Sequence, residues 1–155
     1  MATESTAAQY LTFTLGAELF AMDIRTVREI IQHAALTVVP MTPEFVRGVI
    51  NLRGAVVPVI DLQLRFGRAS AVVGQKTCVV IFDATQDGEK TELGLMVDAV
   101  SEVIEIDPKD IEVPPQFGTS IQRDFIRGMG KVKGEFIVIL EPERALNIDD
   151  MVLAT

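Results

Sequence analysis

The chain has 155 residues, of which 48% are hydrophobic, and it carries a formal net charge of −8. This length suits one ordinary domain or two fused subdomains of about 70 residues each, and the apolar content excludes an intrinsically disordered chain. The negative charge and the lack of a Lys/Arg run argue against nucleic-acid binding, and no apolar run reaches the ~20 residues that a membrane span needs.

The cysteine content and the N-terminus indicate a cellular compartment. The only cysteine, Cys78, excludes an internal disulfide, and its apolar neighbours predict a small buried hydrophobe. The N-terminus has neither a basic start nor an apolar run, so it is not a signal peptide. We therefore expect a cytoplasmic protein that makes no direct membrane contact and reaches a membrane only through a partner.

The first elements in chain order are short. Residues 1–8 are small and polar, which predicts a flexible tail. Residues 10–22 alternate around Gly16 and predict a hairpin. Asp23 is placed to cap a short helical turn, which we expect to carry the apolar positions of residues 24–31 on one face.

The next segment combines a turn with two strands. Residues 36–39 predict a strand that stops at a proline, and residues 42–45 carry a helix-start signal. Residues 49–62 predict two strands around the pair Arg53-Gly54, where glycine can adopt a positive φ. Pro58 lies inside the second of these strands and suggests an edge or a bulge, because proline cannot donate a ladder hydrogen bond.

The second half of the chain follows the same plan. The remaining predicted elements are a connector over 65–75, strands over 77–83, 92–97 and 111–113, a hairpin over 131–140 and a C-terminal helix over about 142–153. Short strands, regular turns and minor helices favour small barrels over a parallel sheet. Two such barrels would leave a groove between them.

An internal repeat supports this plan. The ten residues that begin at Phe45 recur, altered, from Phe125, which is an offset of 80. A second echo, at an offset of 73, matches Ile24, Val27, Ile30 and Ile31 to Val97, Val100, Val103 and Ile104. Chance is the rival explanation, but several echoes in one order favour duplication. We expect one domain over 9–155, with subdomains at about 9–72 and 73–146.

The sequence offers little for catalysis. His33 is the only histidine and lies in a loop pattern, so a His-based triad has a single candidate base. With one Cys and one His a zinc site would lack its usual ligands, and no phosphate-binding glycine motif is present. We expect no catalytic residue, no metal and no cofactor. Two alternatives remain, a small β-barrel hydrolase using paired carboxylates and a barrel that binds a small ligand in a closed apolar cavity.

Residues 47–62, which read RGVINLRGAVVPVIDL, resemble the signature of the CheW family, the coupling proteins of bacterial chemotaxis. The resemblance extends from about Gln9 to Leu153. It implies a mainly β fold of two SH3-like five-stranded β-barrels about a pseudo-twofold axis, with short helices, and no enzymatic activity. It also implies a scaffold that couples the cytoplasmic tips of methyl-accepting chemoreceptors to the CheA histidine kinase. A CheW-like adaptor of a non-motility chemosensory pathway is the alternative within the family.

The resemblance also assigns contact residues. The matching positions of the receptor-binding groove are Val27, Glu29, Arg53, Cys78, Gly94 and Val103. Val27 and Val103 could equally be core residues, Gly94 a strand glycine that allows close backbone approach, and Arg53 a solvated turn residue.

The matching positions for the kinase regulatory domain are Ile50, Leu52, Val56, Val57 and Phe117, although strand alternation sends only some of them outward. Phe117 matches an aromatic residue of a second contact, which joins CheW copies in array rings, and a core anchor is its alternative role.

Overall fold

The computed structural model describes residues 8–16, 18–32, 35–41, 46–61, 63, 74–86, 89–112 and 126–140. These residues form β1 (Ala8–Leu15), β2 (Glu18–Asp23), η1 (Ile24–Thr26), β3 (Val27–Gln32), β4 (Val46–Leu52), β5 (Ala55–Asp61), β6 (Cys78–Gln86), β7 (Glu89–Val97), β8 (Ala99–Ile106), η2 (Pro108–Asp110), β9 (Ile111–Glu112), β10 (Ile126–Val132) and β11 (Glu135–Leu140). Ala8, the last residue of the predicted tail, belongs to β1. Several other predictions lie outside the described residues: the rest of the tail, His33, the helix start at 42–45, most of the connector, Phe117 and the C-terminal helix.

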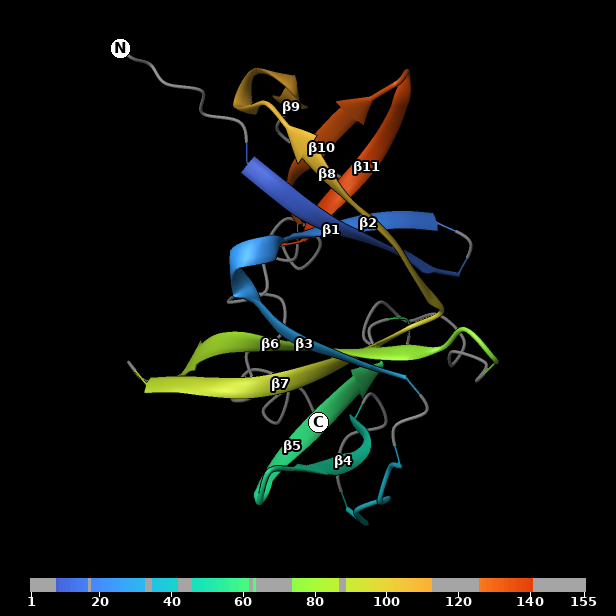
Figure 1. Cartoon of the computed structure of the whole chain (residues 1–155), viewed down its shortest axis with the longest axis vertical. Coiled ribbons are helices and arrows are strands. Elements are labelled where there is room, and N and C mark those ends of the chain that lie inside the picture. Colours follow the sequence, from blue (N-terminus) through green and yellow to red (C-terminus); the bar gives the residue numbers. More distant parts are fainter. Residues whose placement is uncertain are drawn as a thin grey trace.

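Two sheets make up the described fold (Figure 1). Sheet 1 has five strands in the order β3-β6-β7-β5-β4, and sheet 2 has six in the order β8-β1-β2-β11-β10-β9. Figure 1 shows sheet 2 in the upper half of the molecule and sheet 1 in the lower half. The predicted mainly β fold of two small units is therefore confirmed. The short strand predicted over 111–113 is β9, which gives sheet 2 a sixth strand beyond the five expected.

The two sheets do not follow the two halves of the chain. The β1–β2 hairpin belongs to sheet 2, and the β6–β7 hairpin belongs to sheet 1. The first hairpin of each repeat therefore belongs to the sheet whose other strands come from the other repeat. The joining pairs are parallel, β5 with β7 and β11 with β2. A boundary near residue 72 therefore does not separate the sheets, because each sheet takes strands from both sides of it.

The repeat is visible in the strand pairing. Ile30 pairs with Val80 in sheet 1, and Val103, its repeat partner, pairs with Leu11 in sheet 2. The turns also correspond, since Arg53 and Gly54 have φ values of 53° and 87°, and Lys133 and Gly134 have φ values of 52° and 83°. Positive φ at both central residues is what a type I′ hairpin turn requires. The predicted hairpins at these two positions are confirmed.

Three clusters of buried side chains hold the sheets together. One lies between the sheets and includes Phe13 and Phe20, whose rings stack 6.3 Å apart. The others belong to sheet 1 alone and to sheet 2 alone. β6 serves two of the clusters, because Val80 faces the shared core and Val79 faces the core of sheet 1.

The sequence prediction for residues 24–31 was partly wrong. Asp23 does cap a helical turn, but that turn ends at Thr26 and β3 follows. Its β-branched residues pair with β6 instead of continuing the helix, since a paired, half-buried strand suits such side chains better. The strand predicted over 36–39 is reduced to one bridge between Thr37 and Val49.

Pro58 lies in an inner strand, contrary to the predicted edge, and the bulge of this hairpin is in β4. Its partner Val49 exchanges both backbone hydrogen bonds with Thr37, at 2.8 and 2.9 Å. Pro58 therefore occupies a pair that needs no hydrogen bond toward β4. The pairing of β5 with β7 begins one residue later, at Val59.

Candidate functional site

The chain passes between the sheets at two places that correspond in the repeat. At the first, β2 of sheet 2 leads through η1 into β3 of sheet 1, and at the second β7 of sheet 1 leads through Asp98 into β8 of sheet 2. Asp98 fixes the second crossing, because its backbone N–H donates to Thr14 O at 2.9 Å and its carboxylate accepts from Gly16 N at 2.8 Å. The groove described next is lined by the strands that follow these crossings.

A groove of about 630 Å³ lies between β3, β8 and the start of β6. Ile30 and Val100 supply apolar walls, while Gln32, Lys76 and Ser101 supply polar groups. Gln32, Lys76 and Ser101 are exposed, so the groove opens to solvent. A barrel that binds a small ligand would need a closed apolar cavity. This groove is open and has both apolar and polar walls, which suits the binding of a protein segment.

The two faces of β3 make different contacts. Ile30 and Gln32 line the groove, and alternation turns Glu29 toward the opposite face. There, Arg53 Nη1 donates to Glu29 Oε1 at 2.8 Å. This hydrogen bond raises the pKa of Arg53 above its ordinary value. The pair joins the β4–β5 turn to β3, which we call the groove strand because it lines the groove. The predicted residues Glu29 and Arg53 therefore support the groove strand on the face that is turned away from the groove.

The other predicted groove residues are divided between the groove and the core. Cys78 lines the groove, although it is buried, and its Sγ donates to the carbonyl of Lys76 at 3.3 Å. Val27 is half-buried and packs on the shared core, whereas Val103 is 48% exposed on β8. Gly94 is buried in β7. A Cβ there would lie 2.8 Å from Val79 Cγ1, so close packing explains this glycine.

Three of the predicted kinase contacts are core residues instead. Ile50, Leu52 and Val57 belong to the buried cluster of sheet 1. Strand alternation turns them inward, and it turns Val56 outward, where it is 69% exposed. Among the described positions of this set, Val56 is therefore the residue that can meet a partner without rearrangement of the core.

Sequence reasoning missed Ile30 as a groove residue. It is 42% exposed, and in the repeat it corresponds to Val103, which was assigned. The echo at offset 73 was the signal that could have identified it.

In the part of the chain that the structure describes, no three His, Cys, Asp or Glu side chains gather to hold a metal ion. No helix among these described residues has the length and apolarity to cross a membrane.

Two interlocked β sheets with an open groove define a binding scaffold, and comparisons with known proteins identify its family. Residues 9–150 match the CheW-like domain. The chemotaxis protein CheW of Klebsiella aerogenes is 31% identical over 153 residues, which covers 99% of this chain and 90% of that protein. CheW of Rhizobium meliloti is 32% identical over 133 residues, covering 86% and 83% of the two chains.

A solved structure shows the same fold. The scaffolding protein TtCheW from Thermoanaerobacter tengcongensis superposes with a TM-score of 0.78 at 38% identity, covering 89% of this chain and 91% of that one. The chain belongs to the CheW family of chemotaxis proteins.

Proposed function

We propose that this protein is a non-enzymatic scaffold that couples chemoreceptors to the CheA histidine kinase. Membership of the CheW family and the fold of a scaffolding protein support this role. The observation that carries it is the open groove between the sheets, because it offers a surface for a protein segment. The protein would act in the cytoplasm and join membrane receptor arrays through its partners.

The groove is the proposed receptor site. Ile30 and Val103 are exposed apolar side chains on β3 and β8, and Ile30 lines the groove directly. In the groove, the polar residues Gln32 and Ser101 lie with the apolar residues Ile30 and Val100, which is the arrangement of an apolar contact with a polar rim. The cytoplasmic tip of a receptor would bind there through the apolar side of its helical segment.

The outward face of the β4–β5 hairpin is the proposed kinase site, centred on Val56. The corresponding residue of the second hairpin, Phe136, is 53% exposed. The repeat thus presents similar faces at two separate places, and the second would serve another copy of the scaffold in an array ring. A scaffold with two faces can hold two partners in register, and the strength of the signal depends on differential binding to the kinase states.

The test is a pair of binding measurements with opposite expected results. Wild-type protein is titrated with a receptor-tip fragment and, separately, with the CheA regulatory domain. We expect a Kd of about 1 μM for each partner. Ile30→Asp should abolish receptor binding and leave kinase binding intact, whereas Val56→Asp should do the reverse. Val38→Asp is the matched control, because Val38 is a 77% exposed apolar residue that does not line the groove and does not belong to the β4–β5 hairpin.

If folded wild-type protein binds neither partner, the scaffold proposal is wrong. If one variant abolishes both interactions while the protein stays folded, the assignment of two separate faces is wrong.

A further inference from the structure

Two β-bulges of this fold each direct an arginine at a buried aspartate. In the β4–β5 pair, Val46 opposes Ile60 and Gly48 opposes Val59, so Arg47 is the extra residue. A bulge turns the side chain of its extra residue in a new direction. Arg47 Nη1 lies 2.9 Å from Asp61 Oδ2, and the Asp61 side chain is fully buried.

The second bulge repeats this arrangement 80 residues later. Ile126 opposes Leu140 and Gly128 opposes Ile139, which leaves Arg127 as the extra residue of β10. Arg127 Nη1 lies 3.7 Å from Asp23 Oδ2, and the Asp23 side chain is only 7% exposed. Both repeats therefore use a bulged arginine to neutralise a carboxylate that water barely reaches.

The two aspartates occupy different places in the fold. Asp61 ends β5, the strand that forms a hairpin with the strand of its arginine. Asp23 ends β2, which comes from the other repeat and leaves sheet 2 at this residue. Of the two arginine–aspartate pairs, that of Arg127 stands at a crossing between the sheets.

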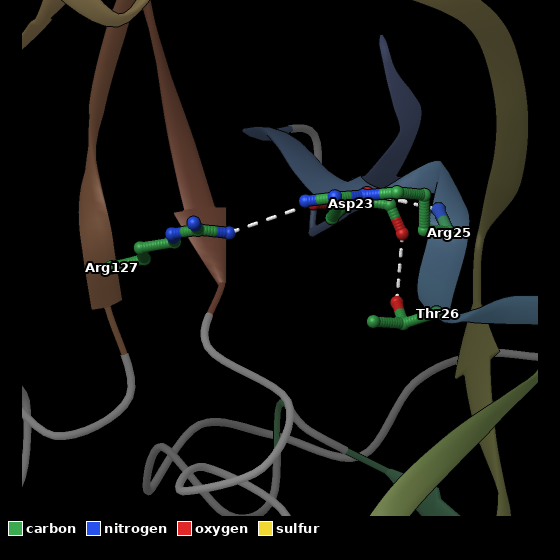
Figure 2. A network of polar contacts seen from close by, with 4 residues as sticks. All are labelled: Asp23, Arg25, Thr26 and Arg127. Atoms are coloured by element: carbon green, nitrogen blue, oxygen red, sulfur yellow. Dashed lines mark hydrogen bonds and ion pairs between the residues drawn. The ribbon is translucent and has the colours of Figure 1, made fainter. Parts of the chain in front are cut away.

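Asp23 also organises the short helix that forms the crossing (Figure 2). Its carboxylate accepts hydrogen bonds from Arg25 N at 2.9 Å, Arg25 Nε at 3.1 Å and Arg25 Nη2 at 2.7 Å. Thr26 Oγ1 donates to the backbone carbonyl of Asp23 at 2.7 Å. Figure 2 shows Arg127 reaching Asp23 from the β10 side while Arg25 and Thr26 belong to η1.

The groove strand begins immediately after this cluster. β3 starts at Val27, the residue after Thr26, and three residues further on Ile30 lines the groove. The Asp23 carboxylate is held by Arg127 of sheet 2 and by Arg25 of η1, so it joins the start of the crossing to sheet 2 and restricts the direction in which the chain continues. The arginines neutralise the buried charge in this geometry, and a rotation of the crossing would move Asp23 away from Arg127.

We propose that Asp23, Arg25 and Arg127 form a positioning cluster that fixes the direction in which the chain leaves sheet 2 toward β3 of sheet 1, and with it the orientation of the two sheets across the groove. The effect on receptor binding rests on the function proposed above. The orientation of the sheets does not, and it can be measured without any partner.

The experiment measures amide residual dipolar couplings of the full chain, which report the relative orientation of the two sheets. Arg127→Met keeps an unbranched apolar stem but removes the charge, and Asp23→Asn keeps the size of the acid. Both variants should change the orientation of sheet 1 relative to sheet 2, while Arg127→Lys should preserve the wild-type orientation. Lys131→Met is the matched control, because Lys131 is an exposed cation on the same strand.

The same samples are titrated with the receptor-tip fragment and with the CheA regulatory domain. Arg127→Met and Asp23→Asn should weaken receptor binding about tenfold, the size usual for coupling between separate sites, and leave kinase binding unchanged. Arg127→Lys should restore receptor binding, which a general loss of stability would not predict. If Arg127→Met does not fold, Arg25→Ala replaces it, since the Arg25 side chain is 77% exposed.

Unchanged sheet orientation in folded Arg127→Met and Asp23→Asn would overturn the positioning role, whatever the binding data show. If the orientation changes but wild-type protein binds no receptor fragment, the positioning role stands and the proposed scaffold function fails. The two proposals can therefore fail independently.

Discussion

Gly94 shows how a single missing side chain determines the packing of sheet 1. A Cβ at this position would lie 2.8 Å from Val79 Cγ1 and 3.2 Å from Val59 Cγ2. Both contacts are to branched side chains that are buried on neighbouring strands, so neither can move away easily. The glycine is therefore needed for close strand packing, and any effect on the groove follows indirectly.

We expect Gly94→Ala to destabilise the protein by about 1–3 kcal/mol, because it overpacks a filled core. Urea unfolding of both proteins measures the change. Gly74→Ala is the control, since the nearest atom to its Cβ would be 4.0 Å away. Equal midpoints for wild type and Gly94→Ala would show that the core adapts to the methyl group and that packing does not explain this glycine.

The charge of Asp23 makes a pH-dependent contribution to stability. The hydrogen bond from the Arg25 side chain is the main reason that the pKa of Asp23 lies below its ordinary value. A carboxyl group whose pKa is lower in the folded state stabilises that state when ionised. This stabilisation is present above the unfolded pKa and is lost as the pH falls through the folded value.

Asp23→Asn should therefore be less stable than wild type at about pH 7, and the difference should shrink at about pH 3. Urea midpoints of the two proteins at both pH values provide the measurement. A difference that stays constant between these pH values would mean that the carboxylate charge contributes nothing and that only the shape of the side chain matters.

At the scale of elements, the pair Glu29–Arg53 decides how the β4–β5 turn supports the groove strand. Arg53 is 67% exposed, so the pair contributes little to global stability, but it holds the turn against β3. The family resemblance assigned both residues to the receptor groove. The structure places their contact on the face of β3 opposite to Ile30, which favours support of the groove over direct contact.

Arg53→Ala should weaken receptor binding several-fold, and it should shift the melting temperature only slightly. The double variant Arg53→Glu with Glu29→Arg should recover most of the binding, because it restores an ion pair in the reverse sense. Titration with the receptor-tip fragment compares the three proteins. Failure of the double variant to recover, with the single effect present, would indicate that Arg53 touches the receptor itself.

The elements also show how much of the fold was predictable. The turn at Arg53-Gly54 was predicted correctly because glycine at a hairpin position is a local signal. β3 was not, since apolar residues at positions 24, 27, 30 and 31 fit a helix equally well. The pairing that makes β3 a strand joins Ile30 to Val80, far away in the sequence. The position of the bulge at Arg127 depends on strand register, which the sequence pattern does not reveal.

At the scale of the whole molecule, duplication was readable in the sequence but the exchange of hairpins was not. The echoes at offsets 73 and 80 relate equivalent strands and do not say which sheet each strand joins. The exchange follows from the shared core, in which Leu11 of β1 and Val80 of β6 are buried in the same cluster. For the groove, the resemblance supplied Cys78, whereas Ile30 was missed although its sequence echo with Val103 pointed to it.

The exchanged hairpins predict that the two sheets unfold as one unit. Phe13 in sheet 2 and Leu95 in sheet 1 are both fully buried in the core that the sheets share. Truncating either side chain removes contacts from both sheets at once. Phe13→Ala should destabilise the protein by about 3–5 kcal/mol, and Leu95→Ala by about 2–5 kcal/mol.

Native-state hydrogen exchange distinguishes a single unit from two independent sheets. For each variant, the most protected amides of sheet 1 and sheet 2 should lose the same free energy of opening, because both exchange through global unfolding. Val38→Ala, at an exposed position, should leave the protection of both sheets unchanged. If Leu95→Ala lowered protection in sheet 1 alone, the sheets would be independent subdomains, and the exchanged hairpins would not couple their folding.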